Sequence, residues 1–245
     1  MIPFPGGTSV SRLRVYDWPV PDLRRPDGAA AGGGTPHLHT VSSEGYVVVA
    51  GAGEVHTLGA DGATRTSLEP GVVAWFTPGV VHRLVDHGGL ELVVAMSNAG
   101  LPEAGDAVLT FPAEVLADPE AYARAATLPS AEHGEAAVGE AALRRRDLAL
   151  EGYAEMLAAV ERDGPEALAP LHAAAARLVA PRVDAWRGLW AERVEPTVEA
   201  THAALATLST SSGTHLADGA IASTTAAPGP ERWGMCGRLR TWDLA

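Results

Sequence analysis

Two patterns of hydrophobic and polar residues divide the chain near Phe111. Before this residue, short runs rich in Val, Leu and Thr alternate with Gly, Pro and Asp, which is typical of β-strands joined by tight turns. After it, long stretches of Ala, Leu, Glu and Arg place apolar residues at helical spacing. We therefore predict a β part followed by a helical part. A parallel α/β sheet is excluded, because no helical stretch separates the predicted strands.

The β part, residues 1–110, is expected to form a barrel or sandwich, because many short strands follow one another closely. Pro-Gly turns at 70–71 and 78–79 are among the signals that separate them. Strands are expected near 11–17, 36–41, 44–50, 53–58, 64–68, 72–77, 81–86 and 90–97.

The helical part, residues 111–208, is expected to be a small bundle. Asp118 precedes a Pro and a Glu, which is a helix-start signal. Helices are expected from about 137 to 162 and within 165–194 and 196–208. Arg144, Arg145 and Arg146 are interpreted as a solvated helix face offset by nearby acids, with an anion site as the alternative.

The third part, residues 209–245, is predicted to be a polar loop and a terminal strand. Residues 209–231 are rich in Ser, Thr, Gly and Pro, which is typical of a long loop or lid. Residues 237–244 return to strand character and repeat part of the pattern of residues 11–18. We expect this strand to return to the barrel.

Composition narrows the function classes. Of 245 residues, 47% are hydrophobic, so the chain is long and apolar enough for a globular core. The formal net charge of -12 argues against nucleic-acid binding and against anionic membranes. All basic residues are Arg, which excludes lysine Schiff-base chemistry. The lone Cys236 excludes an internal disulfide, and no signal peptide or membrane-spanning run is evident, so we expect a soluble, cytoplasmic protein.

One segment of the β part combines residues suited to metal binding. His37 and His39 are two apart on a predicted strand, so their imidazoles project from the same face. Glu44 follows a short turn, and His82 follows the turn at 78–79. Three imidazoles and one carboxylate are a ligand set for one divalent transition metal, such as Fe, Mn, Ni, Cu or Zn. Two positions of an octahedron would remain open for water or substrate.

These residues resemble the cupin family over roughly residues 30–98. In the first cupin motif a His-X-His pair is followed by Glu and then Gly, as in His37, His39, Glu44 and Gly51. In the second motif Pro and Gly precede a third His, here His82; Asp86 stands where the family has Asn. The resemblance implies a jelly-roll β-barrel with a metal at its centre. It also implies a homodimer formed through the sheets, although the apolar helical stretch 137–208 is an alternative interface.

Further candidates surround this ligand set. Tyr46 shares its strand parity with Glu44, so it should point into the barrel; Glu44 and Tyr46 are the candidate catalytic residues. Tyr46, His56 and Met96 are candidate substrate-binding residues. A tyrosine of the core is the equal alternative for Tyr46, and an exposed hairpin histidine is the favoured interpretation of His56. Arg83 alternates with His82 and is expected to face outward.

The favoured function is a metal-dependent cupin enzyme that acts on a small polar metabolite, of the oxygenase or dioxygenase type. The predicted barrel lining is apolar, and no basic phosphate clamp lies near the motifs, unless arginines of the terminal strands turn inward. Those lining residues are Val48, Leu84, Val94 and Met96, and those arginines are Arg12, Arg14, Arg238 and Arg240. A metal-dependent sugar isomerase, epimerase or lyase is the alternative, and a non-catalytic small-molecule-binding cupin is a third hypothesis.

Overall fold

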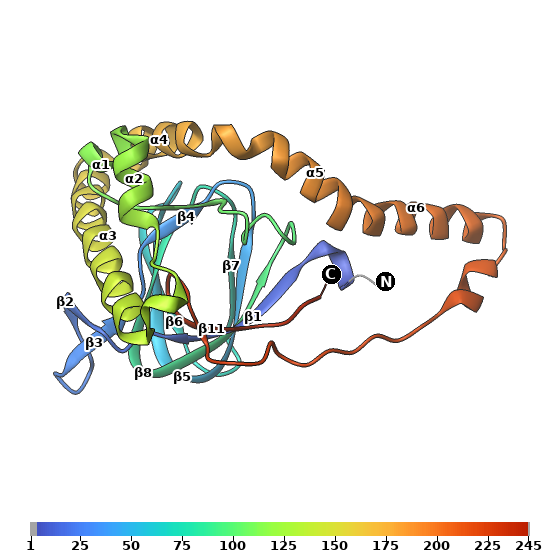
Figure 1. Cartoon of the computed structure of the whole chain (residues 1–245), viewed down its shortest axis with the longest axis horizontal. Helices are drawn as coiled ribbons and strands as arrows, with labels where there is room; N and C mark the ends of the chain where they lie inside the picture. Colours follow the sequence, from blue (N-terminus) through green and yellow to red (C-terminus); the bar gives the residue numbers. More distant parts are fainter. Residues whose placement is uncertain (1–3, 245) are drawn as a thin grey trace.

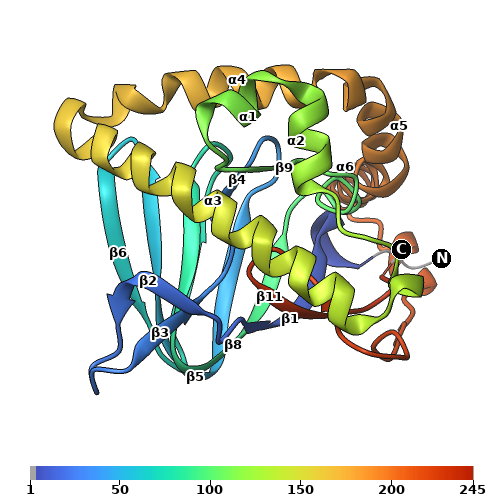
Figure 2. The ribbon, with the colours of Figure 1, turned by 60° about the vertical axis from the view of Figure 1, so that its left-hand side comes forward.

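The structure is a computed structural model that describes residues 4–244. Its described strands form one connected sheet in which every pairing is antiparallel. The sheet curls into a barrel, and the helices cover part of its outside (Figures 1 and 2). The strands are β1 (Ser9–Val15), β2 (Pro19–Arg24), β3 (Ala30–Gly33), β4 (His37–His39), β5 (Glu44–Gly59), β6 (Gly62–Leu68), β7 (Val73–Phe76), β8 (Val81–Met96), β9 (Ala107–Leu109), β10 (Arg232–Trp233) and β11 (Gly237–Thr241).

Two long strands, β5 and β8, form the frame of the barrel. They pair from Glu44 opposite Met96 to Leu58 opposite Val81, with bulges near the middle. The prediction divided each of them into two strands, which is wrong. Glycines allow each strand to continue through its bulge. Gly51 has a φ of +71°, and a side chain there would overlap the backbone of Gly89. The segments that form β2, β3 and β9 lay outside the predicted strands.

Six helices follow the barrel in the described part of the chain. Asp118 begins the second of them, where its carboxylate accepts hydrogen bonds from the backbone N–H groups of Glu120 and Ala121. Figure 2 shows α3 lying diagonally across the barrel. No helix in the described residues is long and apolar enough to cross a membrane. The helices are α1 (Ala113–Ala117), α2 (Pro119–Ala126), α3 (Glu135–Asp163), α4 (Ala169–Val179), α5 (Val183–Arg193) and α6 (Glu195–Ser209).

The apolar core has two main parts. One fills the barrel interior with side chains that include Leu13, Val48, Leu84, Leu92 and Val94. The other lies between the barrel and the helices and is made largely by β4, β9, α3 and α4. Gly152 lets α3 approach β9 closely, because a Cβ there would overlap the backbone of Thr110 and Phe111. The helical part is therefore packed against the barrel rather than separate from it.

The C-terminal segment returns to the barrel. Beyond α6 the chain runs back along the molecule (Figure 1), and β11 pairs with β1, with Ser11 opposite Thr241. The two strands with similar sequence patterns are thus neighbours in the sheet. Cys236 lies against Gly34, where any side chain would overlap its Cα. The same segment stacks Trp233 with Tyr16 and Trp18.

Candidate metal centre

The four predicted ligands converge inside the barrel. His37 and His39 come from β4, Glu44 begins β5, and His82 is near the start of β8. Leu38, between the two histidines, points the opposite way into the core beneath the helices. All four ligand side chains are buried, and one ligand atom from each lies within 4.8 Å of the others. The alternation of β4 therefore places both imidazoles on the interior face while the strand remains anchored to the helical part.

Each imidazole is oriented through its Nδ1 atom. Nδ1 of His37 donates to the carbonyl of Thr35 (2.8 Å), and Nδ1 of His82 donates to that of Val80 (3.2 Å). Nδ1 of His39 lies 2.7 Å from a carboxylate oxygen of Asp106. Carbonyl and carboxylate oxygens accept hydrogen bonds, so each Nδ1 carries a proton and Nε2 is the ring atom that faces the cluster.

The inward-facing atoms crowd together at the centre of the cluster. Nε2 of His37 is 3.2 Å from Nε2 of His82. Oε2 of Glu44 is 3.1 Å from Nε2 of His82 and 3.3 Å from Nε2 of His39, but it is buried without a hydrogen bond. A divalent cation bound among these atoms would replace the protons on them. The donor set and its orientation thus fit a divalent transition metal.

The local electrostatics differ at His37, His39 and Glu44. Burial, together with the neighbouring His82 and His39, lowers the pKa of His37 well below its usual value. Burial also disfavours a charged His39, but Asp106 and Glu44 outweigh it and raise the pKa of His39 to about 9. Burial of Glu44 is outweighed by the close approach of His39 and His82, which holds the pKa of its carboxyl far below the usual range. Glu44 is therefore an anion, as a metal ligand must be.

Asp106 is a functional residue that the sequence did not reveal. It is fully buried, and besides His39 it accepts a hydrogen bond from the backbone N–H of Ser42 (3.0 Å). Its position directly before β9 brings it beside His39, because β9 pairs with β4. No motif marks it, since it lies 67 residues from His39 in the sequence. A carboxylate behind a ligating imidazole is a common support for metal sites.

Tyr46 and Met96 lie close to the ligands. Both were predicted to face the interior of the barrel. Tyr46 is fully buried in the barrel core, and its hydroxyl has no hydrogen-bond partner. Burial and the Glu44 carboxylate raise the pKa of Tyr46 well above its usual value. Met96 is opposite Glu44 in the β5–β8 pairing. Phe76 covers His82 with ring centroids 4.2 Å apart.

His56 does not join this group. It is buried, but it lies on the outer face of the barrel opposite Arg83, while the adjacent Val55 points into the interior. The expectation that it binds substrate does not fit this position, and neither does an exposed hairpin histidine. Arg83 faces outward as predicted, but it is buried beneath α3, where it lies over the ring of Tyr153.

The arginine run of α3 also differs from its interpretation as a solvated face. Arg144 is exposed, but Arg145 and Arg146 are buried. Arg146 donates to the carbonyl of Trp18 and forms an ion pair with Asp147. α3 lies against the barrel (Figure 2), and Arg145 donates to the carbonyl of Gly234 in the C-terminal segment.

Asp86 clarifies one departure from the cupin motif. Its carboxylate accepts hydrogen bonds from the backbone N–H groups of Gly88 and Leu90. It therefore fixes the irregular turn within β8 and lies outside the ligand cluster. Asp86, at the position where the family has Asn, therefore stabilises the turn within β8.

Comparisons with known proteins give only distant matches. No family model matches the chain, and no curated protein matches it in sequence. Among solved structures, an uncharacterised Klebsiella pneumoniae protein with a double-stranded β-helix domain is 17% identical, with a TM-score of 0.29, over 40% of this chain and 71% of that one. An oxalate decarboxylase variant from Bacillus subtilis is 19% identical, with a TM-score of 0.34, over 45% of this chain and 27% of that one.

A TDP-quinovose 3,4-ketoisomerase from Campylobacter jejuni is 13% identical, with a TM-score of 0.28, over 36% of this chain and 60% of that one. At such low values these matches carry no argument about activity. The fold follows from the antiparallel barrel itself and from the positions of its ligands on β4, β5 and β8. The N-terminal part of the chain is an antiparallel, cupin-like β-barrel, with a buried cluster of three histidines and one glutamate that could hold a metal ion.

Proposed function

We propose that this protein is a metal-dependent enzyme that acts on a small polar metabolite inside its barrel, with an oxygenase-type reaction. One observation carries the proposal: the three Nε2 atoms and the Glu44 carboxylate converge on one point, while every Nδ1 is held by an acceptor behind it. This arrangement of nitrogen and carboxylate atoms suits a bound cation.

His37, His39, Glu44 and His82 would hold the metal and leave two coordination positions open. A transition metal there supplies Lewis-acid or one-electron chemistry. Around it, the chain excludes water: the four ligand side chains are buried, and Phe76 covers one side. Tyr46 provides a buried hydroxyl with no partner, which is suited to donate a hydrogen bond to a bound polar substrate.

The barrel lining favours an oxygenase over an isomerase of phosphorylated sugars. Val48, Leu84 and Val94 are buried in the interior, and Met96 packs against them. A phosphosugar site needs a basic clamp. The arginines of the terminal strands are engaged elsewhere: Arg12 pairs with Glu91, Arg14 and Arg240 pair with Glu231, and Arg238 pairs with Glu135. Mainly apolar surroundings of the metal would suit dioxygen and a compact substrate.

The test is the metal content of protein purified without a metal-affinity tag, measured by elemental analysis. We expect about one metal per chain, lost in His37→Ala and His82→Ala variants. His133→Ala is the matched control, because His133 is exposed and far along the chain from the cluster. Iron would support the oxygenase reaction and direct a screen of small polar substrates with and without dioxygen.

Other outcomes separate the alternatives. Zinc or manganese in place of iron would favour a metal-dependent isomerase, epimerase or lyase. A protein with no metal and no uptake on reconstitution would contradict the enzyme proposal and leave a small-molecule-binding cupin. Metal retained in both the His37→Ala and His82→Ala variants would place the ion elsewhere and remove the basis of the proposal.

A further inference from the structure

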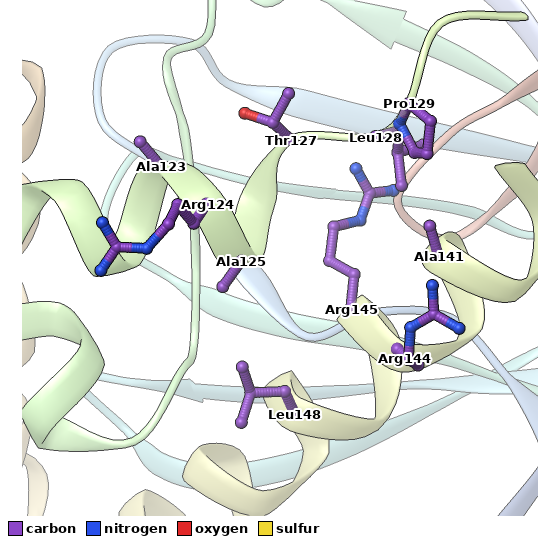
Figure 3. Close-up of a pocket in the computed structure, with 10 residues that line it drawn as sticks. All are labelled: Ala123, Arg124, Ala125, Thr127, Leu128, Pro129, Ala141, Arg144, Arg145 and Leu148. Carbon is purple, nitrogen blue, oxygen red and sulfur yellow. The ribbon is translucent and has the colours of Figure 1, made fainter. Parts of the chain in front are cut away.

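A second concave site lies between α2 and α3, outside the barrel. It has a volume of about 740 Å³ and is open on one side. Figure 3 shows Arg145 rising from α3 toward the segment 127–129, with Arg124 of α2 and Arg144 of α3 on either side. No acidic residue lines the pocket, although acids outnumber basic residues in the whole chain by 30 to 18.

Arg145 gives this pocket a fixed positive charge without a counterion. Its side chain is 91% buried, and its guanidinium donates to the carbonyls of Ala126 and Gly234. Within residues 4–244, no carboxylate forms an ion pair with it. Its Nε is buried and lacks any hydrogen-bond partner. A buried charge that is hydrogen-bonded but not neutralised favours an anion nearby.

Arg124 and Arg144 are exposed charges at the edge of the same pocket. Both side chains are exposed, and each forms only a loose ion pair within its helix, Arg124 with Glu120 at 3.6 Å and Arg144 with Glu140 at 3.8 Å. Such exposed pairs contribute little stability. Their guanidinium groups can therefore turn toward an anion at little cost, and the fork of N–H groups on each suits an oxyanion.

We propose that this pocket binds the carboxylate or phosphate group of a small amphiphilic ligand. The positive charges of Arg124, Arg144 and Arg145 would attract the oxyanion. The rest of the lining is mostly apolar, including Leu128, Pro129 and Leu148, and would contact a short hydrocarbon body. This site is separate from the metal centre and does not depend on the reaction proposed there.

The experiment is isothermal titration of the full chain with three probes that share a hydrocarbon body: hexanoate, hexyl phosphate and 1-hexanol. We expect one saturable site per chain for at least one anionic probe and much weaker binding of hexanol. Comparing hexanoate with hexyl phosphate distinguishes a carboxylate ligand from a phosphate ligand. The variant Arg124→Gln/Arg144→Gln should lower the affinity about tenfold or more, because two charge-assisted contacts are lost.

The matched control is Arg162→Gln/Arg177→Gln, which removes the same charge from exposed positions on α3 and α4 away from the pocket. It should leave the affinity unchanged. Circular dichroism melting confirms that each variant is folded, and the single variants Arg124→Gln and Arg144→Gln repeat the test if the double variant is destabilised. Equal binding of hexanol, no saturable binding of either anion, unchanged affinity in the pocket variant, or an equal loss in the control would each overturn the proposal.

Discussion

Asp106 holds His39 from behind, with 2.7 Å between its carboxylate oxygen and Nδ1 of the imidazole. Its other carboxylate oxygen accepts the backbone N–H of Ser42, and its carbonyl accepts the N–H of Thr40. One buried residue thus fixes both the ring orientation of a candidate metal ligand and the turn that leads from β4 to β5. Because Glu44 follows this turn, Asp106 positions two of the four ligands.

Asp106→Asn should lower metal affinity by about 10- to 100-fold. An amide has one acceptor oxygen, so if that oxygen keeps the hydrogen bond from Ser42, its NH₂ group faces Nδ1 of His39. His39 would then carry its proton on Nε2 and could not bind a metal through that atom. Competition with a chromophoric chelator measures the affinity.

The control for this variant is Asp118→Asn, which changes an exposed helix cap far from the ligands. It should leave metal affinity unchanged while lowering stability slightly. Metal affinity equal to wild type in the Asp106→Asn protein, with only its melting temperature lowered, would show that Asp106 supports the fold and not the site.

Three of the ligands could be predicted from local spacing. The two-residue period of a strand puts His37 and His39 on one face, and a short turn brings in Glu44. His82 lies 45 residues from His37, and its place in the set follows from its resemblance to the second cupin motif. Asp106 could not be predicted in this way. It reaches His39 only through the pairing of β9 with β4, a contact between distant segments that no local pattern encodes.

The arginines of α3 show a second limit. Helical periodicity identifies which residues share a face, but it does not reveal that α3 lies across the barrel. Arg145 and Arg146 are buried because the carbonyls of Gly234, Trp18 and Gly33 lie beside them. Those partners come from the barrel and the C-terminal segment, so only tertiary structure distinguishes a buried arginine from a solvated one.

Tyr46→Phe should stabilise the protein while impairing substrate binding. The hydroxyl is buried without a hydrogen bond, so its removal should raise the free energy of unfolding by about 1 kcal/mol. If the hydroxyl contacts substrate, affinity for a bound substrate or analogue should fall in the same variant. Chemical denaturation and ligand titration measure the two effects. Lower stability would mean that the hydroxyl has a partner in solution, and unchanged ligand affinity would remove Tyr46 from the binding site.

A homodimer should form through the outer face of the sheet at β5 and β7. Val47, Val73 and Trp75 are exposed there, Trp75 to 75%, and they form an uncharged apolar surface. Among the described strands β7 pairs only with β5, so its other edge can pair with a second copy. Light scattering after size exclusion should show a dimer for the wild type and a monomer for Trp75→Glu.

Leu205→Glu is the matched variant for the alternative helical interface, because Leu205 is an exposed apolar residue of α6. It should leave the dimer intact. A monomer in this variant, with a dimer retained in Trp75→Glu, would assign the interface to the helices. A monomeric wild type at all concentrations would contradict both versions.

His56 should make the fold less stable as the pH falls. Its neutral ring can form a hydrogen bond with each of two neighbours. Nε2 donates to Glu54 (2.6 Å), and Nδ1 accepts from a guanidinium nitrogen of Arg83 (3.4 Å). Protonation would set a second N–H against that cation. Burial, with further contributions from Arg83 and Arg65 and an opposing one from Glu54, accordingly lowers the pKa of His56 below the usual value of about 6.5.

The unfolded chain therefore binds this proton more readily than the folded protein. As a result, the free energy of unfolding keeps its full value above about pH 6.5 and decreases below that pH. In His56→Gln the decrease between about pH 7 and pH 5 should be smaller, as measured by urea denaturation at several pH values. Contributions of the other histidines are the same in both proteins and cancel in the comparison. His133→Gln, which changes an exposed histidine, should keep the wild-type slope. Identical slopes in wild type and His56→Gln would show that His56 keeps an ordinary pKa in the folded protein.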